Sequence, residues 1–246
     1  MTAPIYERPG LRWPLRIFVA SAAAAGLGLA FLSPGARPWL FAAVLMAGAF
    51  LAFSVWDETR GRAAALARLR ARWLSQPDVI SDAADGAEGA DLFFKEEGQP
   101  LIARLAFAKA PAVAILTPLR ETTAAFRIAS KALPRPSFDG HDPPVGGPPL
   151  SPLPGLQLML HDALSVEGNE PGQLERWLDA ELGSALVAAA RDHAASFRGL
   201  TFDGRFLAVH WLGEIVSDPA AVRALSAPLW RQFVPRLPPA RGELLN

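Results

Sequence analysis

A charge-free apolar run at residues 39–56, WLFAAVLMAGAFLAFSVW, constrains this chain more than any other feature of its sequence. A helix that crosses a bilayer needs about 20 predominantly apolar residues, and this run with its flanking residues approaches that length. Trp39 and Trp56 stand at its two ends, where aromatic side chains favour the membrane–water interface. The run therefore predicts a membrane-spanning helix.

A second charge-free run, IFVASAAAAGLGLAFLS, precedes it at residues 17–33. This run is rich in alanine and would insert only marginally alone. Pro34 and Gly35 should end its helix and Pro38 should start the next one, so a tight turn would join two spans. We therefore predict a transmembrane helical hairpin at residues 17–56.

Two other interpretations of the apolar runs stay open. A buried helical hairpin in a large soluble core is disfavoured because charge-free runs this long are rare outside membranes. A cleaved signal peptide over the first run fits its basic flank, but no convincing small-x-small cleavage site follows, and a second apolar run comes immediately.

Arginines are distributed unevenly around the two runs. Residues 1–16 contain Arg8, Arg12 and Arg16, whereas only Arg37 lies between the runs. Five more follow the second run: Arg60, Arg62, Arg68, Arg70 and Arg72. Since cytoplasmic flanks carry the excess of basic residues, both termini are expected in the cytoplasm. The chain is predicted to be a multi-pass protein of a bacterial inner (plasma) membrane, with residues 1–16 as a basic cytoplasmic tail.

Small residues recur four positions apart in both runs, a spacing that lets helix backbones approach closely. The residues that this pattern selects for helix packing are Ala22, Gly26, Gly28, Ala30, Gly48 and Ala52. They would pack the hairpin on itself or on other membrane helices. Alternatively, such rows arise by chance in alanine-rich spans.

Residues 57–75 predict a basic amphipathic helix beside the membrane, ending before Pro77. Leu66, Leu69 and Trp73 share one face, and Arg68 and Arg72 share another. Basic residues near a cytoplasmic membrane surface attract anionic headgroups. The expected membrane-interface residues are therefore Trp39, Trp56, Arg60, Arg62, Arg68 and Arg72. A solvated arginine face, with the apolar face packed on the following domain, is the alternative.

Residues 76–132 are predicted to form the first half of a cytoplasmic α+β domain. Within it, residues 101–107 alternate in polarity as a half-buried strand does, and residues 112–116 form a second strand begun by Pro111. The acidic, glycine-containing stretch at 81–91 is expected to be a flexible linker or loop, and residues 123–130 are ambiguous between strand and helix.

Residues 133–155 are dominated by proline and glycine, which excludes a helix or a central strand and indicates a surface loop or linker. Pro149 and Pro152 have the PxxP spacing of a polyproline II docking segment, so a soluble partner could bind there.

Residues 156–234 predict the second half of the domain. Residues 156–162 alternate as a strand does, and a helix should begin at Pro171 with Asn169 or Glu170 as its cap. The apolar stripe of that helix comprises Leu174, Trp177, Leu178, Leu182, Ala185, Leu186 and Ala189.

The stretch GLTFDGRFLAVHWL predicts a β-hairpin with Asp203 and Gly204 as a two-residue turn. One face of it would carry Leu200, Phe202, Leu207, Val209 and Trp211. Ser217 or Asp218 should then cap a helix that starts at Pro219 and is kinked or restarted at Pro228, and residues 235–246 are expected to be a loose tail. The predicted fold is α+β, a sheet with helices on one face.

Signatures of catalysis or cofactor binding are missing from the sequence. The four histidines, His141, His161, His193 and His210, do not form a pattern of metal ligands, and there is no cysteine. Equal numbers of basic and acidic residues, 24 each, argue against a nucleic-acid partner. We therefore expect no catalytic, cofactor or metal site, no cofactor and no enzymatic activity.

These patterns favour a non-catalytic accessory or assembly subunit of a membrane protein complex. Its expected partners are other integral membrane proteins and lipid headgroups. The alternative is a membrane-tethered sensory or regulatory domain that binds a small ligand or a soluble protein. An unrecognised enzyme, with His161, Asp162 and His210 as its best candidate groups, is less favoured.

Overall fold

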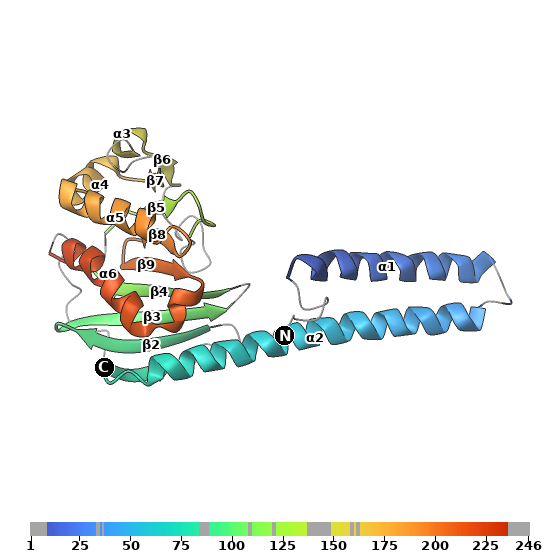
Figure 1. Cartoon of the computed structure of the whole chain (residues 1–246). Coiled ribbons are helices and arrows are strands. Elements are labelled where there is room, and N and C mark those ends of the chain that lie inside the picture. The colour runs from blue at the N-terminus through green and yellow to red at the C-terminus, as the bar shows by residue number, and fades with distance from the viewer. Residues whose placement is uncertain are drawn as a thin grey trace. The chain divides into compact units, whose positions relative to one another are not determined.

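The computed structural model describes residues 9–32, 35, 37–83, 89–107, 110–119, 122–136, 149–157, 160 and 163–235. The chain divides into two units, Met1–Arg62 and Ala63–Asn246, which are described separately (Figure 1).

The first unit contains α1 (Pro9–Leu32) and the beginning of α2 (Arg37–Leu74), which lie side by side (Figure 1). Half-buried side chains recur three or four positions apart in both helices, the spacing of two helices in contact. In α1 they are Arg16, Val19, Ala23 and Gly26, and in α2 they are Leu40, Val44, Ala47, Leu51 and Ser54. The two helices predicted from the apolar runs are therefore present and pack on each other.

The second unit is an antiparallel sheet with helices, which confirms the α+β class. Its described strands are β1 (Val79–Ala83), β2 (Gly89–Glu96), β3 (Gln99–Phe107), β4 (Pro111–Pro118), β5 (Phe126–Ser130), β6 (Ser151–Pro152), β7 (Leu164–Gly168), β8 (Phe197–Phe202) and β9 (Phe206–Leu212). Their order in the sheet is β1-β2-β3-β4-β9-β8-β5-β7-β6. The described helices after α2 are α3 (Pro154–Gln157), α4 (Pro171–Trp177), α5 (Ala180–Asp192), the 3-10 helix η3 (Glu214–Ser217) and α6 (Pro219–Phe233).

One face of the sheet forms the core. Alternate side chains of the strands, such as Leu105 of β3 and Val209 of β9, are fully buried together with Leu182 of α5 and Phe233 of α6. Figure 1 shows α5 and α6 over the strands. The other alternate positions carry most of the polar strand residues, as expected where successive side chains point to opposite faces.

The last turns of α2 belong to this core. Leu66, Leu69 and Trp73 are buried, as their shared helix face predicted. The Trp73 Nε1 group donates a hydrogen bond of 3.0 Å to the carbonyl oxygen of Val216. The helix ends at Leu74, before Pro77 as expected. One helix therefore begins in the apolar hairpin and ends as part of the α+β domain.

The predicted hairpin of β8 and β9 is confirmed, and all five residues of its predicted apolar face are buried. The predicted two-residue turn is wrong, because Phe202 pairs with Leu207 and the turn is longer. The Asp203 carboxylate accepts hydrogen bonds from the backbone N–H groups of Arg205 and Phe206, which stabilises the longer turn. The sequence predicted which face of the hairpin is buried, because that depends on the alternation of apolar and polar residues. The length of the turn depends instead on hydrogen bonds of a local side chain.

Two loop predictions need correction. The stretch at 81–91 is not simply a linker, because its ends lie in β1 and β2, while residues 84–88 are outside the described residues. Asp91 pairs with Arg104 of β3 at 2.8 Å, so an acidic residue is accommodated within the sheet. The proline-rich stretch at 133–155 contains the edge strand β6 and the start of α3, and residues 137–148 are not described.

The strand predicted at 156–162 is wrong where the structure describes it. Leu156 lies in α3, which Pro154 begins, and Leu156 and Leu160 are both buried. Their spacing of four suits a helical turn as well as a strand, which explains the error. The strand of this region is β7, which the sequence analysis missed.

The predicted helix at 171–189 is two helices. α4 begins at Pro171 as expected, but without a side-chain cap from Glu170, and the chain breaks after Trp177. Asp179 then caps α5, its carboxylate accepting a hydrogen bond of 2.9 Å from the Leu182 N–H. The sequence did not reveal this break, because Leu178 at the junction is also buried and so continues the apolar stripe.

α6 begins at Pro219 with Asp218 as its cap, as predicted. It then continues through Pro228, so the expected restart there is wrong. Pro228 removes the donor that would bond the Ala224 carbonyl. Both residues are exposed, so water can bond that carbonyl. The residues from 236 onward, the predicted tail, lie outside the described part.

Gly199 generates the first testable prediction. Its φ of +134° is unfavourable for other residues, and an added Cβ would lie 2.1 Å from the carbonyl oxygen of Ile128. G199A should therefore lower the free energy of unfolding by about 3 kcal/mol or more. Urea unfolding of the full-length protein in detergent, followed by tryptophan fluorescence, measures this change.

G172A is the matched control, because an added Cβ at Gly172 in α4 meets no atom within 4 Å. It should leave stability unchanged or raise it by about 0.5–1 kcal/mol. Equal stability of the two variants would contradict the described approach of β8 to β5.

Candidate functional site

The hairpin exposes many large apolar side chains. They are Ile17, Phe18, Leu27, Phe41, Leu45, Met46, Phe50, Phe53, Val55 and Trp56, and two of them, Leu45 and Met46, are 74% exposed. Soluble monomers rarely expose contiguous apolar patches of more than a few hundred Å². This surface therefore suits hydrocarbon chains or partner helices.

One of the described helices is long and apolar enough to cross a membrane. It covers Leu40–Leu74, and none of its most apolar window is buried within the protein. The described apolar part of α1, Arg16–Gly28, is shorter. The structure thus supports one membrane-spanning helix by length and composition, and a second crossing by α1 stays a prediction.

A polar contact joins α1 to α2 near Trp56. The Arg16 guanidinium donates hydrogen bonds to the Ser54 hydroxyl, at 3.1 Å, and to the Ser54 carbonyl oxygen, at 2.9 Å. The guanidinium of Arg60 lies 4.7 Å from the centre of the Trp56 ring, a cation–π contact. Two basic groups and an amphipathic aromatic ring thus gather at this end of the hairpin, as at a membrane interface. The side chain of Trp39 is outside the described residues, and that of Arg62 is exposed.

The small residues chosen from the sequence take different positions. A Cβ added to Gly26 would lie 3.6 Å from Val44 of α2, so Gly26 is in the contact between the helices. Gly28 and Gly48 have open space around them, and Ala22 and Ala52 are exposed. The side chain of Ala30 is not described. The exposed small residues therefore stay candidates for contact with other helices.

Sequence reasoning missed most of the contact between α1 and α2. On α2 it overlooked Leu40, Ala47, Leu51 and Ser54, which make the contact together with Val44, a residue of the predicted row that includes Gly48 and Ala52. The signal that could have found them is their alternating spacing of four and three, which marks one face of a helix paired with another. A search for small residues alone overlooks Leu51 and Ser54.

A small pocket lies beside the last turns of α2, and its volume is about 210 Å³. It is lined by Ala65, Arg68, Leu69, Arg72, Phe107, Pro111 and Ser217. Two of the predicted membrane-interface residues, Arg68 and Arg72, therefore share one pocket. The structure adds the β3 and β4 ends and Ser217, which are distant in sequence.

A larger hollow of about 570 Å³ lies where α5 meets the end of β5. Its lining is mostly alanine and valine, with two cations: Ser130, Lys131, Ala132, Ala163, Val187, Ala190, Arg191 and Ala194. No sequence motif marked this hollow, because short side chains at its walls are ordinary in an alanine-rich chain.

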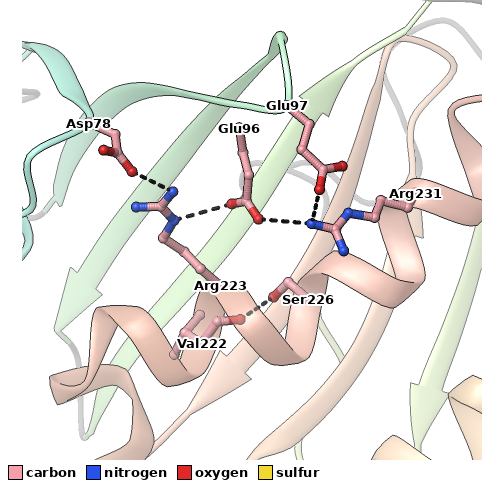
Figure 2. A network of polar contacts seen from close by, with 7 residues as sticks. All are labelled: Asp78, Glu96, Glu97, Val222, Arg223, Ser226 and Arg231. Atoms are coloured by element: carbon pink, nitrogen blue, oxygen red, sulfur yellow. Dashed lines mark hydrogen bonds and ion pairs between the residues drawn. The ribbon is translucent and has the colours of Figure 1, made fainter.

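Figure 2 shows an ionic network that joins α6 to Glu96 at the end of β2, to Glu97 in the turn after it, and to Asp78, which precedes β1. Arg223 lies 2.9 Å from Asp78 and 3.2 Å from Glu96, and Arg231 lies 2.6 Å from Glu97 and 3.5 Å from Glu96. Because every charge in it has an opposite partner, the network fastens α6 to the sheet edge and offers no open group for chemistry.

A second polar cluster lies on the sheet face opposite the core. The buried Arg127 pairs with Glu167 at 3.2 Å, and Glu167 also pairs with Arg135 at 2.6 Å. His210 Nε2 lies 2.7 Å from the Thr201 hydroxyl. Burial, and then the guanidinium groups of Arg198 and Arg127, lower the pKa of His210 from 6.5 to about 3. His210 is therefore neutral at physiological pH.

Of the other histidines, only His193 is among the described residues, and its position does not indicate a catalytic or metal site. His193 is the C-cap residue of α5, and its ring lies edge-on to the Trp211 ring with the two ring centres 5.8 Å apart. His141, His161 and Asp162 lie outside the described residues. Within the described part of the chain, no three His, Cys, Asp or Glu side chains are close enough to hold a metal ion.

Neither a protein-family model nor a curated protein matches the chain. Among solved structures, it is similar to the crystal structure of the mycobacterial trehalose monomycolate transport factor A, TtfA. The identity is 14%, the TM-score is 0.47, and the match covers 72% of this chain and 97% of that chain. A similarity at this level carries no argument about function.

His210 generates a prediction about pH. Between pH 6.5 and about 3 the unfolded chain binds a proton at this side chain that the folded chain does not, so stability falls as pH falls through this range. From pH 7 to pH 5, His210 should remove about 2 kcal/mol of unfolding free energy.

Urea unfolding of full-length wild type and H210Q at both pH values checks this prediction. H210Q should lose most of the pH dependence, whereas H193Q, which leaves His210 in place, should keep it. A wild-type stability that is constant from pH 7 to pH 5 would contradict the description of His210 as a buried neutral group.

Proposed function

We propose that this protein is a non-catalytic accessory or assembly subunit of a membrane protein complex. In this proposal α1 and the first part of α2 form a two-span anchor in a bacterial inner membrane, with both termini and the α+β domain in the cytoplasm. The observation that carries the proposal is the exposed apolar surface of the hairpin, which includes Leu45 and Met46.

The exposed small residues of the hairpin support a partner within the membrane. Lipid chains are as apolar as leucine, so helices in a bilayer associate through close packing at small residues. Gly48 and Ala52 lie on α2 outside the contact with α1, next to large exposed side chains such as Phe53. A partner helix can approach the backbone there.

The continuity of α2 supports a scaffolding role. Its first part carries the apolar surface, and its last turns are in the core of the domain through Leu69 and Trp73. α2 therefore contributes residues both to the surface that a partner would bind and to the core of the domain. The described polar clusters also fit a structural role, since the Arg223 network and the Arg127–Glu167 pair join secondary-structure elements.

Affinity purification of the tagged full-length protein in mild detergent, with mass spectrometry, tests this function. The wild type should bring down a stoichiometric set of membrane proteins. G48L should lose that set because leucine blocks the close approach of a helix, while G48L itself still sediments with the membrane.

A43L is the matched control. Ala43 is also exposed on α2 but lies about 140° around the helix from Gly48. It should keep the partners. A wild-type protein that purifies alone at physiological expression, yet stays in the membrane, would refute the accessory role and leave the anchor intact.

The hollow beside α5 favours a second function, a membrane-tethered domain that binds a small ligand. Its volume of about 570 Å³ is within the range of about 300–1,000 Å³ for ligand sites. Its alanine and valine lining would contact an apolar chain, and Lys131 and Arg191 would attract an anionic end group. A fatty acid has this chemistry.

Thermal unfolding of the full-length protein with and without palmitate tests this function. Palmitate should raise the Tm of the wild type and leave the Tm of A190L unchanged, because a leucine at Ala190 fills the hollow. K131A/R191A should weaken the effect while the hollow stays open. Equal Tm shifts in all three proteins would show that palmitate binds elsewhere.

A further inference from the structure

The pocket beside the last turns of α2 contains two arginines on the same helix face. Arg68 and Arg72 are one helical turn apart and both are exposed. The Arg68 Nε group donates a hydrogen bond of 3.2 Å to the carbonyl oxygen of Ala64, which helps to fix its guanidinium. Two like charges at this spacing destabilise a helix slightly unless an anion lies between them.

These arginines differ from others in the domain. Arg104, Arg223 and Arg231 each pair with at least one carboxylate. Within the described part of the chain, neither Arg68 nor Arg72 has a carboxylate partner. Their charge is therefore available to an anion from outside the protein.

The rest of the pocket has a different character. Leu69 is buried at its base, and the half-buried Phe107 and Pro111 form an apolar wall. Ser217 adds one hydroxyl group. A bound anion could thus have its oxygen atoms at the guanidinium groups and the hydroxyl, and its carbon substituent against the apolar wall.

The size of the pocket limits its ligand. At about 210 Å³ it is smaller than the ~300 Å³ at which sites for drug-sized ligands begin. It can hold one tetrahedral anionic group and the first atoms attached to it. Guanidinium groups bind the oxygen atoms of phosphate in a bidentate manner, which a single lysine cannot do.

We propose that this pocket binds the phosphate group of a phosphate ester through Arg68 and Arg72. The ester could be a membrane lipid or a soluble molecule. Both share the phosphate group that the two guanidinium groups would bind.

The lipid source rests on the membrane anchor proposed above, and the soluble source does not. The experiment uses the full chain in nanodiscs of phosphatidylcholine and, in a second arm, in nanodiscs that also contain phosphatidylglycerol. Calorimetric titration with inorganic phosphate measures the soluble source in the first arm. Native mass spectrometry counts retained phosphatidylglycerol in the second.

R68Q/R72Q should weaken phosphate binding at least tenfold or abolish retention of phosphatidylglycerol. A65L, which fills the pocket and keeps both charges, should do the same. The matched control R176Q/R205Q removes two exposed charges of the domain outside the pocket lining, and Arg176 also donates its Nε group to the carbonyl oxygen four residues earlier, so this variant should keep the wild-type values. Circular dichroism checks that the variants are folded.

Phosphate binding with no retained lipid identifies a soluble ester, and retained lipid without phosphate binding identifies a headgroup. Both results support the site. The site is refuted if the wild type binds neither probe, if R68Q/R72Q binds as the wild type does, or if R176Q/R205Q loses binding as fully as R68Q/R72Q does. A chain that fails to enter nanodiscs but binds phosphate in detergent would refute the anchor and leave the site standing.

Discussion

The pairing of β9 with β4 holds the α+β domain together. Without the β8–β9 hairpin, strands β1 to β4 and strands β5, β7 and β6 would be two separate sheets, because β4 and β5 do not pair in the described sheet. The hairpin joins them through β9 on one side and β8 on the other. Its buried Trp211 donates a hydrogen bond of 2.8 Å to Ser226 of α6, so the same hairpin positions the helix that the ionic network fastens to the sheet edge.

Arginine side chains make different contacts in different parts of the molecule. Arg16 bonds to a neighbouring helix, Arg127 and Arg223 are paired inside the domain, and Arg68 and Arg72 line a pocket. Desolvating a charge is costly unless it is paired, which explains why the buried Arg127 and the half-buried Arg223 have carboxylate partners. Arg68 and Arg72 are exposed, and within the described part of the chain neither has a carboxylate partner. No ion pair among the described residues therefore explains why they lie together.

Sequence patterns predicted the elements whose signals are local and strong. The cap and proline of α6, the alternation of β3 and the apolar face of β8–β9 were correct, since each depends on a few neighbouring residues. The break at Asp179 and the strand β7 were missed because a helical stripe and a short alternation fit more than one structure. The strand order could not be predicted, because the insertion of β8–β9 between β4 and β5 depends on contacts between segments far apart in sequence.

Only the local part of the pocket beside α2 could be predicted from the sequence. Helix spacing identified Arg68 and Arg72 as neighbours on one face. It could not show that Phe107, Pro111 and Ser217 complete a pocket around them, since these residues come from two other parts of the chain, the β3–β4 connection and the end of η3. Likewise, Gly26 was selected by its spacing, but only the structure separates it from Gly48, where an added Cβ would meet no described atom within 4 Å.

The position of the β8–β9 hairpin also sets the order of events during synthesis. A ribosome makes the apolar helices first and the strands that join the two half-sheets almost last. Long-range strand pairing is slow, and chains are made from the N-terminus at about 5–20 residues per second. The apolar helices are therefore made well before β9 can join the two half-sheets. A message cut short before β9 would yield a chain that has both apolar helices and cannot complete its fold.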